Sequence, residues 1–263
     1  MLNALELLKS GYYVTPTILN HRIVSFFATL YPLQTSHMLI RLGGSSDGAY
    51  LLPDDLTGII ANFSPGTGSS ILFEKELYEY AGIQSHLLDP TVEHPRHHPC
   101  IGSFQPKYLG PYTDRSSICL ADWVMTTYNE HTNLDFMAQI DIEGDEYLTL
   151  LTVPSELLAK FRIIIVEFHS VYSWASIDFF PTIQKLFSRI LDFFYVAHLH
   201  ANNNDEFVNL PCGPCPRTLE ITFHRRDRVQ LPGPTSILPH DLDILNNPEK
   251  PYVHIPQYWN TSI

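Results

Sequence analysis

Residues 58–89 read GIIANFSPGTGSSILFEKELYEYAGIQSHLLD, and this stretch decides the fold. It begins with a short apolar strand over 58–63 and continues into a turn that contains Gly66 and Gly68. Apolar residues at helical spacing then predict a helix over 71–81. A second strand over 84–88 ends at Asp89. Strand, glycine turn, helix and strand in this order predict a βαβ unit with parallel strands.

The same alternation continues along the chain. Residues 118–128 predict a short strand that leads into a helix, and residues 135–142 predict a further strand. Residues 161–168 are almost continuously apolar, as in a strand buried on both faces. After a helix over 177–191, two strands over 192–200 and 218–224 follow without a helix between them. We therefore expect an α/β fold with a mostly parallel sheet and an antiparallel hairpin at one edge.

The remaining segments flank this core. Residues 1–40 are predicted to be an N-terminal helical segment, since apolar residues recur there at helical spacing. Residues 91–117 are rich in Pro, His and Tyr and predict an irregular region. Residues 226–263 are predicted to be a Pro-rich wrap over the surface. A chain of 263 residues fits one α/β domain, with its core at 41–225.

Composition excludes several classes of partner. The formal net charge is −12, and no basic run offers a nucleic-acid footprint. No stretch of about 18 apolar residues and no signal-peptide pattern is visible, so we expect no membrane partner and a cytoplasmic location. Cys212 and Cys215 have redox-motif spacing, but prolines flank them and a strand follows. We expect free thiols rather than a redox centre.

The glycine turn is the first candidate binding site. Gly66 and Gly68 allow close backbone approach to a ligand, and free N–H groups at the following helix favour polar groups. Asp89 lies 21 residues after Gly68, where a carboxylate can accept hydrogen bonds from ribose hydroxyls. The turn lacks a third glycine, which disfavours NAD. An ordinary βα turn without a ligand is the alternative.

Polar clusters at three later strand ends are further candidates. Asp141 and Glu143 follow the strand over 135–142, His169 follows the strand over 161–168, and His200 ends the strand over 192–200. Because the ends of parallel strands meet at one edge, these side chains could share a crevice. A grouping of Asp141, Glu143, His169 and His200 could bind a divalent cation or act as a general base. Each histidine could instead be a hydrogen-bonded structural residue.

Taken together, these elements resemble the FkbM-type, or methyltransferase-21, family. The resemblance covers about residues 40–225, with residues 242–248 also similar. The matching elements are Asp-Gly-Ala-Tyr (47–50), Ser-Pro-Gly-Thr-Gly (64–68) with Phe-Glu (73–74), Leu-Asp-Pro-Thr (88–91), Ile-Asp-Ile-Glu-Gly-Asp-Glu (140–146), Glu-Phe-His (167–169), His-Ala-Asn-Asn (200–203) and Leu-Glu-Ile-Thr (219–222).

The resemblance implies a Rossmann-like class I methyltransferase fold with seven strands, the last of them antiparallel. It implies S-adenosylmethionine bound by the turn from Ser64 through Gly68, with Asp89 on the ribose and Asp122 beside the adenine. The reaction would be methyl transfer to an oxygen of a small molecule or sugar. The protein must then align the acceptor and remove its proton. His169 or His200 would be the base, with Asp141 as its partner or as a ligand of a Mg or Mn ion.

Two other functions remain open at this point. The first is a non-catalytic binding protein that retains the fold, because the turn reads Ser-Pro-Gly-Thr-Gly-Ser and its proline removes a donor. The second is a metal-dependent hydrolase that uses Asp141, Glu143, His169 and His200. Cofactor binding separates the methyltransferase from both alternatives, since fold alone does not fix function.

Overall fold

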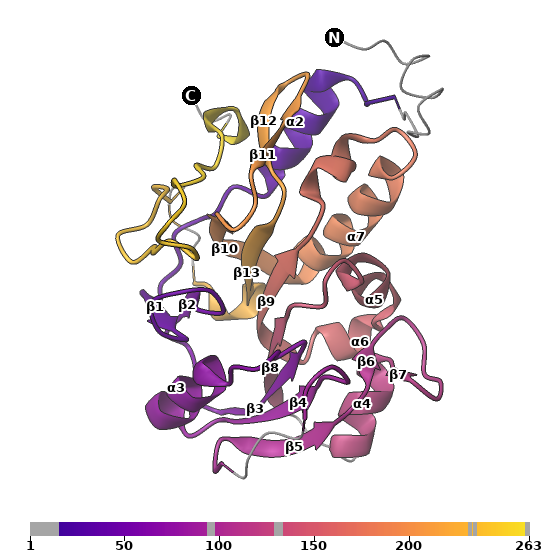
Figure 1. Cartoon of the computed structure of the whole chain (residues 1–263), viewed down its shortest axis with the longest axis vertical. Helices are drawn as coiled ribbons and strands as arrows, with labels where there is room; N and C mark the ends of the chain where they lie inside the picture. Colours follow the sequence, from indigo (N-terminus) through magenta and orange to yellow (C-terminus); the bar gives the residue numbers. More distant parts are fainter. Residues whose placement is uncertain (1–15, 94–97, 129–133, 231–232, 234–235, 261–263) are drawn as a thin grey trace.

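The computed structural model describes residues 16–93, 98–128, 134–230, 233 and 236–260, and its centre is one seven-stranded sheet (Figure 1). The order of the strands is β10-β13-β9-β8-β3-β4-β5. Their bounds are β3 (Ile59–Pro65), β4 (Gln84–Leu88), β5 (Ile101–Gln105), β8 (Asp135–Ile140), β9 (Phe161–Phe168), β10 (Phe194–Ala201) and β13 (Leu219–Arg225).

Strand order and direction identify the fold. Strands β5, β4, β3, β8 and β9 pair in parallel, whereas β13 pairs antiparallel with both β9 and β10. Numbered along the chain within this sheet, the order is 3-2-1-4-5-7-6 with an antiparallel seventh strand. This is the Rossmann-like class I methyltransferase topology. The mostly parallel sheet and the antiparallel pair at its edge are thereby confirmed.

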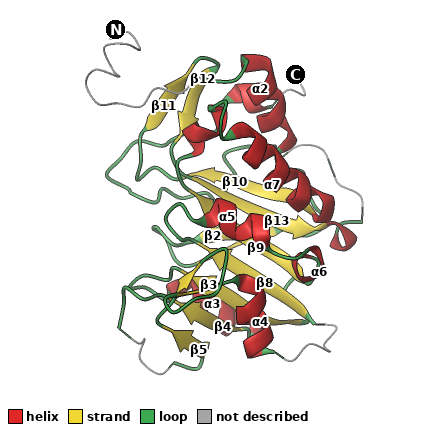
Figure 2. Ribbon diagram, turned by 90° about the vertical axis from the view of Figure 1, so that its right-hand side faces the viewer, coloured by secondary structure: helices red, strands yellow, loops and turns green. Residues whose placement is uncertain are grey.

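Both faces of the sheet are covered, which explains the continuous apolar runs in its strands (Figure 2). One face packs against α2 (Asn20–Thr29), α4 (Leu120–Thr127), α5 (Glu146–Thr152) and α7 (Phe180–Phe193). The other face packs against α3 (Leu72–Ala81) and the hairpin of β1 (Leu39–Leu42) and β2 (Tyr50–Pro53). The short helix α6 (Ser155–Leu158) precedes β9. No helix in the described ranges is long and apolar enough to cross a bilayer.

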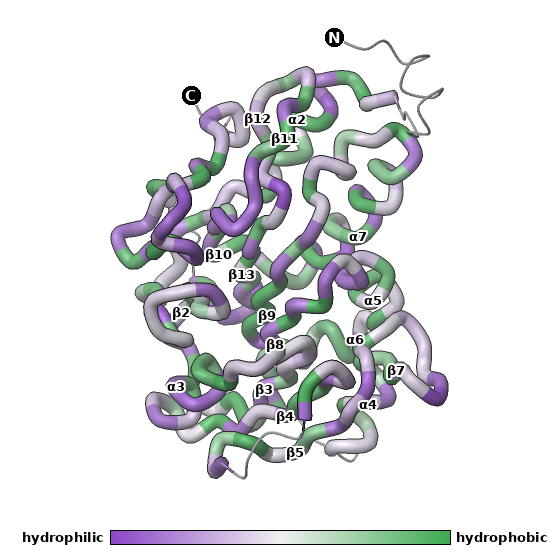
Figure 3. Tube along the Cα trace, viewed as in Figure 1, coloured by the Kyte–Doolittle hydropathy of each residue, from purple (hydrophilic) through white to green (hydrophobic). Residues whose placement is uncertain are grey.

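Helix α7 shows how the sequence produces this packing. Phe180, Ile183, Phe187 and Ile190 are buried and recur at steps of three and four residues, so they form one apolar face. Each such side chain contributes about 1.5–3 kcal/mol when fully buried. Pro181 occupies the first turn, where its missing N–H costs nothing. Hydrophobic residues also dominate the central strands in Figure 3.

The C-terminal segment, residues 236–260, contains no strand and one short 3-10 helix, at 257–259. It lies against the edge of the sheet beside β10 (Figure 1). Trp259 is fully buried and stacks on Phe27 of α2, with ring centroids 3.9 Å apart and planes 7° apart. The segment therefore takes part in the core rather than only covering it.

Three segments differ from the expected structure. Residues 91–117, expected to be irregular, contain β5, β6 (Tyr108–Leu109) and the first residue of β7 (Ser117–Ile118). Residues 201–217, which join the last two predicted strands, contain the hairpin of β11 (Phe207–Leu210) and β12 (Gly213–Pro216). Within the expected helical segment only 20–29 is helical, because Pro32 prevents continuation, and residues 1–15 lie outside the described ranges.

A buried charge cluster stabilises the end of the sheet at which β9 begins and β13 finishes. The Asp55 side chain is 5% exposed and accepts hydrogen bonds from Arg228 at 2.9 Å and His224 at 3.0 Å. Arg162 lies 3.4 Å from it. Burial alone would raise the pKa of Asp55, but hydrogen bonds from Arg228 and His224 and the charge of Arg162 lower it to about 2.

Replacing Asp55 with Ala is expected to reduce the free energy of unfolding by about 3–5 kcal/mol, because buried Arg162 loses part of its charge compensation. The contribution is complete above the ordinary Asp pKa and disappears as pH falls through about 2. Asp227, 62% exposed and paired with Arg225, is the control, and Asp227→Ala should cost less than about 1 kcal/mol. Urea unfolding measures both variants, and equal losses would contradict the assignment.

Candidate functional site

A pocket of about 190 Å³ lies at the carboxyl ends of β3, β4 and β8. This is where the strand order reverses, the usual ligand-binding position in an open α/β sheet. Typical small-molecule pockets are larger, from about 300 Å³. The residues that line the pocket are Gly66, Gly68, Leu88, Asp89, Pro90, Thr91, Lys107, Tyr108, Leu109, Asp141, Ile142, Glu143 and Asp145.

Gly66 lies where two strand ends come together. Its φ is +75°, and a Cβ at this position would lie 1.6 Å from the backbone oxygen of Asp141. Its N–H donates to the carbonyl of Leu88 at 2.8 Å. The turn after β3 is thus in direct contact with the ends of both β4 and β8. Only glycine permits this approach and this backbone conformation together.

Asp89 accepts hydrogen bonds that hold the glycine turn and Thr91 in place. One carboxylate oxygen accepts the N–H of Gly68 at 2.9 Å, and the other accepts the N–H and hydroxyl of Thr91 at 2.8 and 2.6 Å. A carboxylate has about four lone-pair positions, so acceptor capacity remains for a ligand hydroxyl. Asp89 therefore fixes the glycine turn and retains the ability to bind a diol.

Two of the predicted cofactor-binding residues, Ser64 and Asp122, do not line the pocket. Ser64 is buried beneath the turn, with its hydroxyl 2.6 Å from Glu74 and 2.7 Å from the Gln139 carbonyl. Burial raises the pKa of Glu74, and a protonated Glu74 can donate to Ser64 while Ser64 donates to Gln139. Asp122, in the first turn of α4, accepts a hydrogen bond from Thr113.

His169 is surrounded by carboxylates at the end of β9. Its Nδ1 lies 2.9 Å from Glu146, which is fully buried. Its Nε2 lies 3.8 Å from Asp141 and 3.5 Å from Glu143. Because the carboxylate of Glu146 accepts the Nδ1 proton, the lone pair of neutral His169 lies on Nε2, the nitrogen that faces Asp141 and Glu143. The structure thus brings three predicted site residues together.

Backbone geometry at this cluster is unusual. Glu143 and Ser170 both have φ of +56°, although neither is glycine. Such conformations cost roughly 1–3 kcal/mol each and persist where surrounding contacts enforce them. One residue belongs to the cluster and the other directly follows His169, so the strain is concentrated at this end of the sheet.

Burial and neighbouring charges shift the pKa values of Asp141 and His169. Burial raises the pKa of Asp141 to about 7, with Glu143 and Glu146 adding to the rise and His169 opposing it. One oxygen of Asp141 is buried without a hydrogen-bond partner. Burial would lower the pKa of His169, but Glu146 and Asp141 outweigh it and raise that pKa. Groups of this kind are suited to proton transfer.

His200 belongs to a different group. Its Nε2 lies 2.9 Å from Asn246, and its Nδ1 lies 3.4 Å from Asp243. Burial would lower its pKa, but Glu220 and Asp243 raise that pKa to about 9. The sequence predicted one crevice for His169 and His200, but the structure places the two histidines in separate clusters.

A row of three carboxylates, two of them buried, lies between these two clusters. Oxygens of Asp47, Glu167 and Glu220 lie within 4.8 Å of one another. Burial raises the pKa of both Glu167 and Glu220. The amide of Asn202 donates to Asp47 and Glu167, and that of Asn246 donates to Asp47 and Glu220. Asp47, Glu220 and residues 242–248 all lay in elements of the family resemblance, which is the signal that could have marked them.

Comparisons with known proteins add little to this geometry. No family model matches the chain, and no curated protein matches it. Among solved structures, the crystal structure of the 23S rRNA methyltransferase ErmE matches with a TM-score of 0.32 and 13% identity, covering 83% of this chain and 73% of that chain. We take the fold from the strand order, and membership of the FkbM-type family stays a prediction.

Gly66 and Gly68 provide a matched pair for testing the turn. Both have positive φ, but a Cβ at Gly68 meets nothing within 4 Å. Gly68→Ala should cost about 1–2 kcal/mol of stability from backbone conformation alone. Gly66→Ala should cost at least about 1 kcal/mol more, because the Asp141 backbone must move. Thermal unfolding of the two variants measures the difference, and equal stabilities would show that the strand ends can separate freely.

Proposed function

We propose that the protein is an S-adenosylmethionine-dependent methyltransferase that methylates an oxygen of a small molecule or glycan. The observation that carries the proposal is the pocket at the reversal point of a 3-2-1-4-5-7-6 sheet, built from Gly66, Gly68 and Asp89. The glycine turn supplies backbone room for the ligand, and Asp89 supplies an acceptor for ribose hydroxyls.

The charge of the pocket fits this cofactor. Four acidic residues and one lysine line it: Asp89, Asp141, Glu143, Asp145 and Lys107. S-adenosylmethionine carries a positive sulfonium and a positive amino group, so carboxylates at the strand ends favour it. The present volume of about 190 Å³ is small for the whole molecule, so binding requires the pocket to widen.

When bound, the cofactor supplies an activated methyl group. The chain must then align the acceptor and remove its proton. His169 is the proposed base, because Glu146 holds its Nδ1 and leaves Nε2 facing the pocket residues Asp141 and Glu143. Asp141 stabilises the imidazolium that forms when His169 accepts the proton.

The acceptor is proposed to be neutral or cationic. The acidic strand ends and a net charge of −12 repel a polyanion. This favours a small molecule or glycan over the rRNA that the name of ErmE specifies.

A divalent cation at the same cluster is proposed as the alternative to a free His169 base, since the Nε2 lone pair cannot bind a metal and accept a proton at once. Ligand atoms of Asp141, Glu143 and His169 lie within 4.8 Å of one another, and oxygen and imidazole ligands suit Mg or Mn. Such an ion would orient the acceptor and lower the pKa of its hydroxyl. The same group would serve a metal-dependent hydrolase, so turnover without a methyl donor would select that alternative.

Cofactor binding is tested by calorimetry with S-adenosylmethionine on the purified chain, with EDTA or with added magnesium. Asp89→Asn should weaken binding about 10- to 100-fold, since a charged hydrogen bond of about 1.5–3 kcal/mol is lost. Asp122→Asn should bind like the unmodified chain, because Asp122 does not line the pocket. Absence of binding under every condition would reject the methyltransferase and favour a non-catalytic protein or the hydrolase.

The proposed base predicts a pH dependence. Methyl transfer should fall as pH drops through about 7, the value to which burial raises the pKa of Asp141, because protonated Asp141 cannot stabilise the imidazolium and protonated His169 cannot accept a proton. His169→Gln should reduce kcat about 100- to 10,000-fold and leave cofactor affinity within a few-fold. His200→Gln is the comparison, because His200 was the other base predicted from the sequence and lies in the other cluster. A larger loss at His200 than at His169 would overturn the assignment.

A further inference from the structure

We propose that His198, His200 and Asp243 form a binding site for one divalent transition-metal ion of the zinc type, which fastens the C-terminal segment to β10. This site is separate from the pocket above and does not depend on the proposed function. The ligand atoms are His198 Nε2, His200 Nδ1 and Asp243 Oδ1. Two imidazoles and one carboxylate are a ligand set that zinc and related ions prefer.

The geometry is close to that of a bound ion. His198 and His200 alternate on β10 and therefore project from the same face of the strand. Asp243 Oδ1 lies 2.8 Å from His198 Nε2 and 3.4 Å from His200 Nδ1, and all three ligand atoms lie within 4.8 Å of one another. Tetrahedral ligands at zinc distances lie about 3.3 Å apart. Small side-chain shifts complete the site.

The tautomer of His200 points to a cation. Asn246 directs its amide nitrogen to Glu220 at 2.7 Å and Asp47 at 3.0 Å, so its oxygen faces His200 Nε2 at 2.9 Å. Nε2 must then carry the proton, which leaves the lone pair of neutral His200 on Nδ1. That atom is buried without a hydrogen-bond partner and faces the Asp243 carboxylate. A cation between this nitrogen and the carboxylate, either a proton on Nδ1 or a metal ion that displaces it, balances the two groups.

The hydrogen bond from His200 to Asn246 also matches the surroundings of known metal ligands. A metal-bound histidine usually donates its other N–H to a carbonyl or carboxylate, which fixes the ring. Here the carbonyl of Asn246 has this role, and two carboxylates hold Asn246 in turn. The outer support of the site is therefore already assembled.

Comparison with Asp55 shows that Asp243 is paired with histidines and not with arginines. Asp55 also lies between two histidines, His37 and His224, but Arg162 and Arg228 neutralise it. The Asp243 side chain is 2% exposed, and within the described ranges no Lys or Arg lies within 4.0 Å of its oxygens. A buried carboxylate is costly unless it is paired or binds a metal. The cluster around Asp243 is thus the one that a metal ion would complete.

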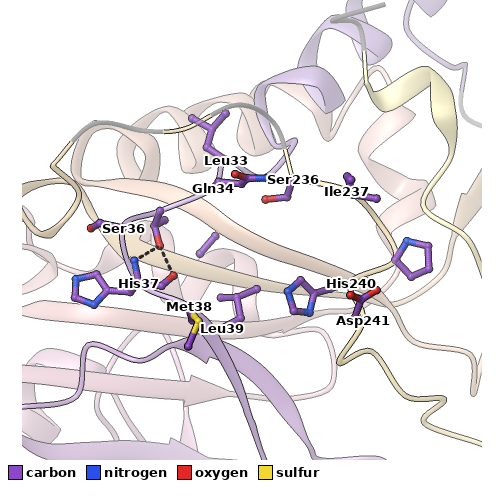
Figure 4. Close-up of a pocket in the computed structure, with 13 residues that line it drawn as sticks. Leu33, Gln34, Ser36, His37, Met38, Leu39, Ser236, Ile237, His240 and Asp241 are labelled. Carbon is purple, nitrogen blue, oxygen red and sulfur yellow. Dashed lines mark hydrogen bonds between the residues drawn. The ribbon is translucent and has the colours of Figure 1, made fainter.

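A groove lies beside the site. Residues 33–39 form one wall and residues 236–241 the other, and the groove has a volume of about 400 Å³ (Figure 4). His240 lines the groove, and its ring lies 6.1 Å from that of His198. The backbone N–H of His240 donates to Asp243 at 2.8 Å. His240 therefore lies between the groove and the proposed ligands.

The test uses the full chain after EDTA treatment and dialysis, titrated with Zn²⁺ by calorimetry and with Co²⁺ by visible absorption. We expect one ion per chain at this site, with the intense Co²⁺ bands of a four- or five-coordinate nitrogen and oxygen site. His200→Gln and Asp243→Asn should each weaken binding at least 100-fold. His224→Gln, in the arginine-neutralised cluster, should bind like the unmodified chain. Circular dichroism confirms that each variant is folded.

Two further measurements keep the outcome decisive. Zn²⁺ should protect the C-terminal segment from limited proteolysis in the unmodified chain but not in Asp243→Asn. Asp141→Asn distinguishes the other candidate cluster, and its binding at the His200 site should persist. Absence of stoichiometric Zn²⁺ binding, or binding that survives both His200→Gln and Asp243→Asn, would overturn the proposal. S-adenosylmethionine titrated into the same metal-free protein tests the methyltransferase independently.

Discussion

Burial of negative charge at the end of the sheet where the parallel strands finish is the constraint on which the rest of the structure depends. Glu146, Glu167 and Glu220 are buried at the carboxyl ends of the strands, and Asp141 lies beside them. Histidine, asparagine and tyrosine side chains and backbone N–H groups, rather than arginines, supply their hydrogen bonds. Imidazoles and amides leave the region with negative potential, so it attracts cations and holds protons near neutral pH.

At the other end of the sheet, where the parallel strands begin, arginines compensate the carboxylates. There Arg162, Arg225 and Arg228 neutralise Asp55 and Asp135. A carboxylate neutralised by guanidinium groups stays ionised and contributes to stability. Arginines therefore keep the carboxylates ionised at one end of the sheet, whereas the proton and cation chemistry proposed above belongs to the other end of the same strands.

Local sequence patterns were sufficient for much of the fold. Strands β4 and β9 have the bounds expected from their apolar runs, because a buried strand needs continuous apolar residues. Gly66 and Asp89 were identified from spacing alone and do lie in one pocket. Strand β5 was missed, since the edge strand Ile101–Gln105 is half-exposed and has no clear alternation.

Contacts between distant residues could not be predicted in this way. His200 was grouped with His169 because both follow predicted strands, yet its partners Asp243 and Asn246 come more than 40 residues later, from a segment without strands. Periodicity carries no information about which side chains such a segment presents. The number of strands in the sheet likewise followed from the family resemblance rather than from composition or spacing, and the strand order comes from the structure.

The position of β13 has a consequence for the order of assembly. This strand is the last of the sheet along the chain, yet it lies between β9 and β10. During synthesis from the N-terminus, the five parallel strands can pair first, while β10 has no neighbour until β13 emerges. Throughout that interval β9, buried along its whole length in the finished sheet, has an open edge. The nascent chain is then most exposed to aggregation and chaperone capture.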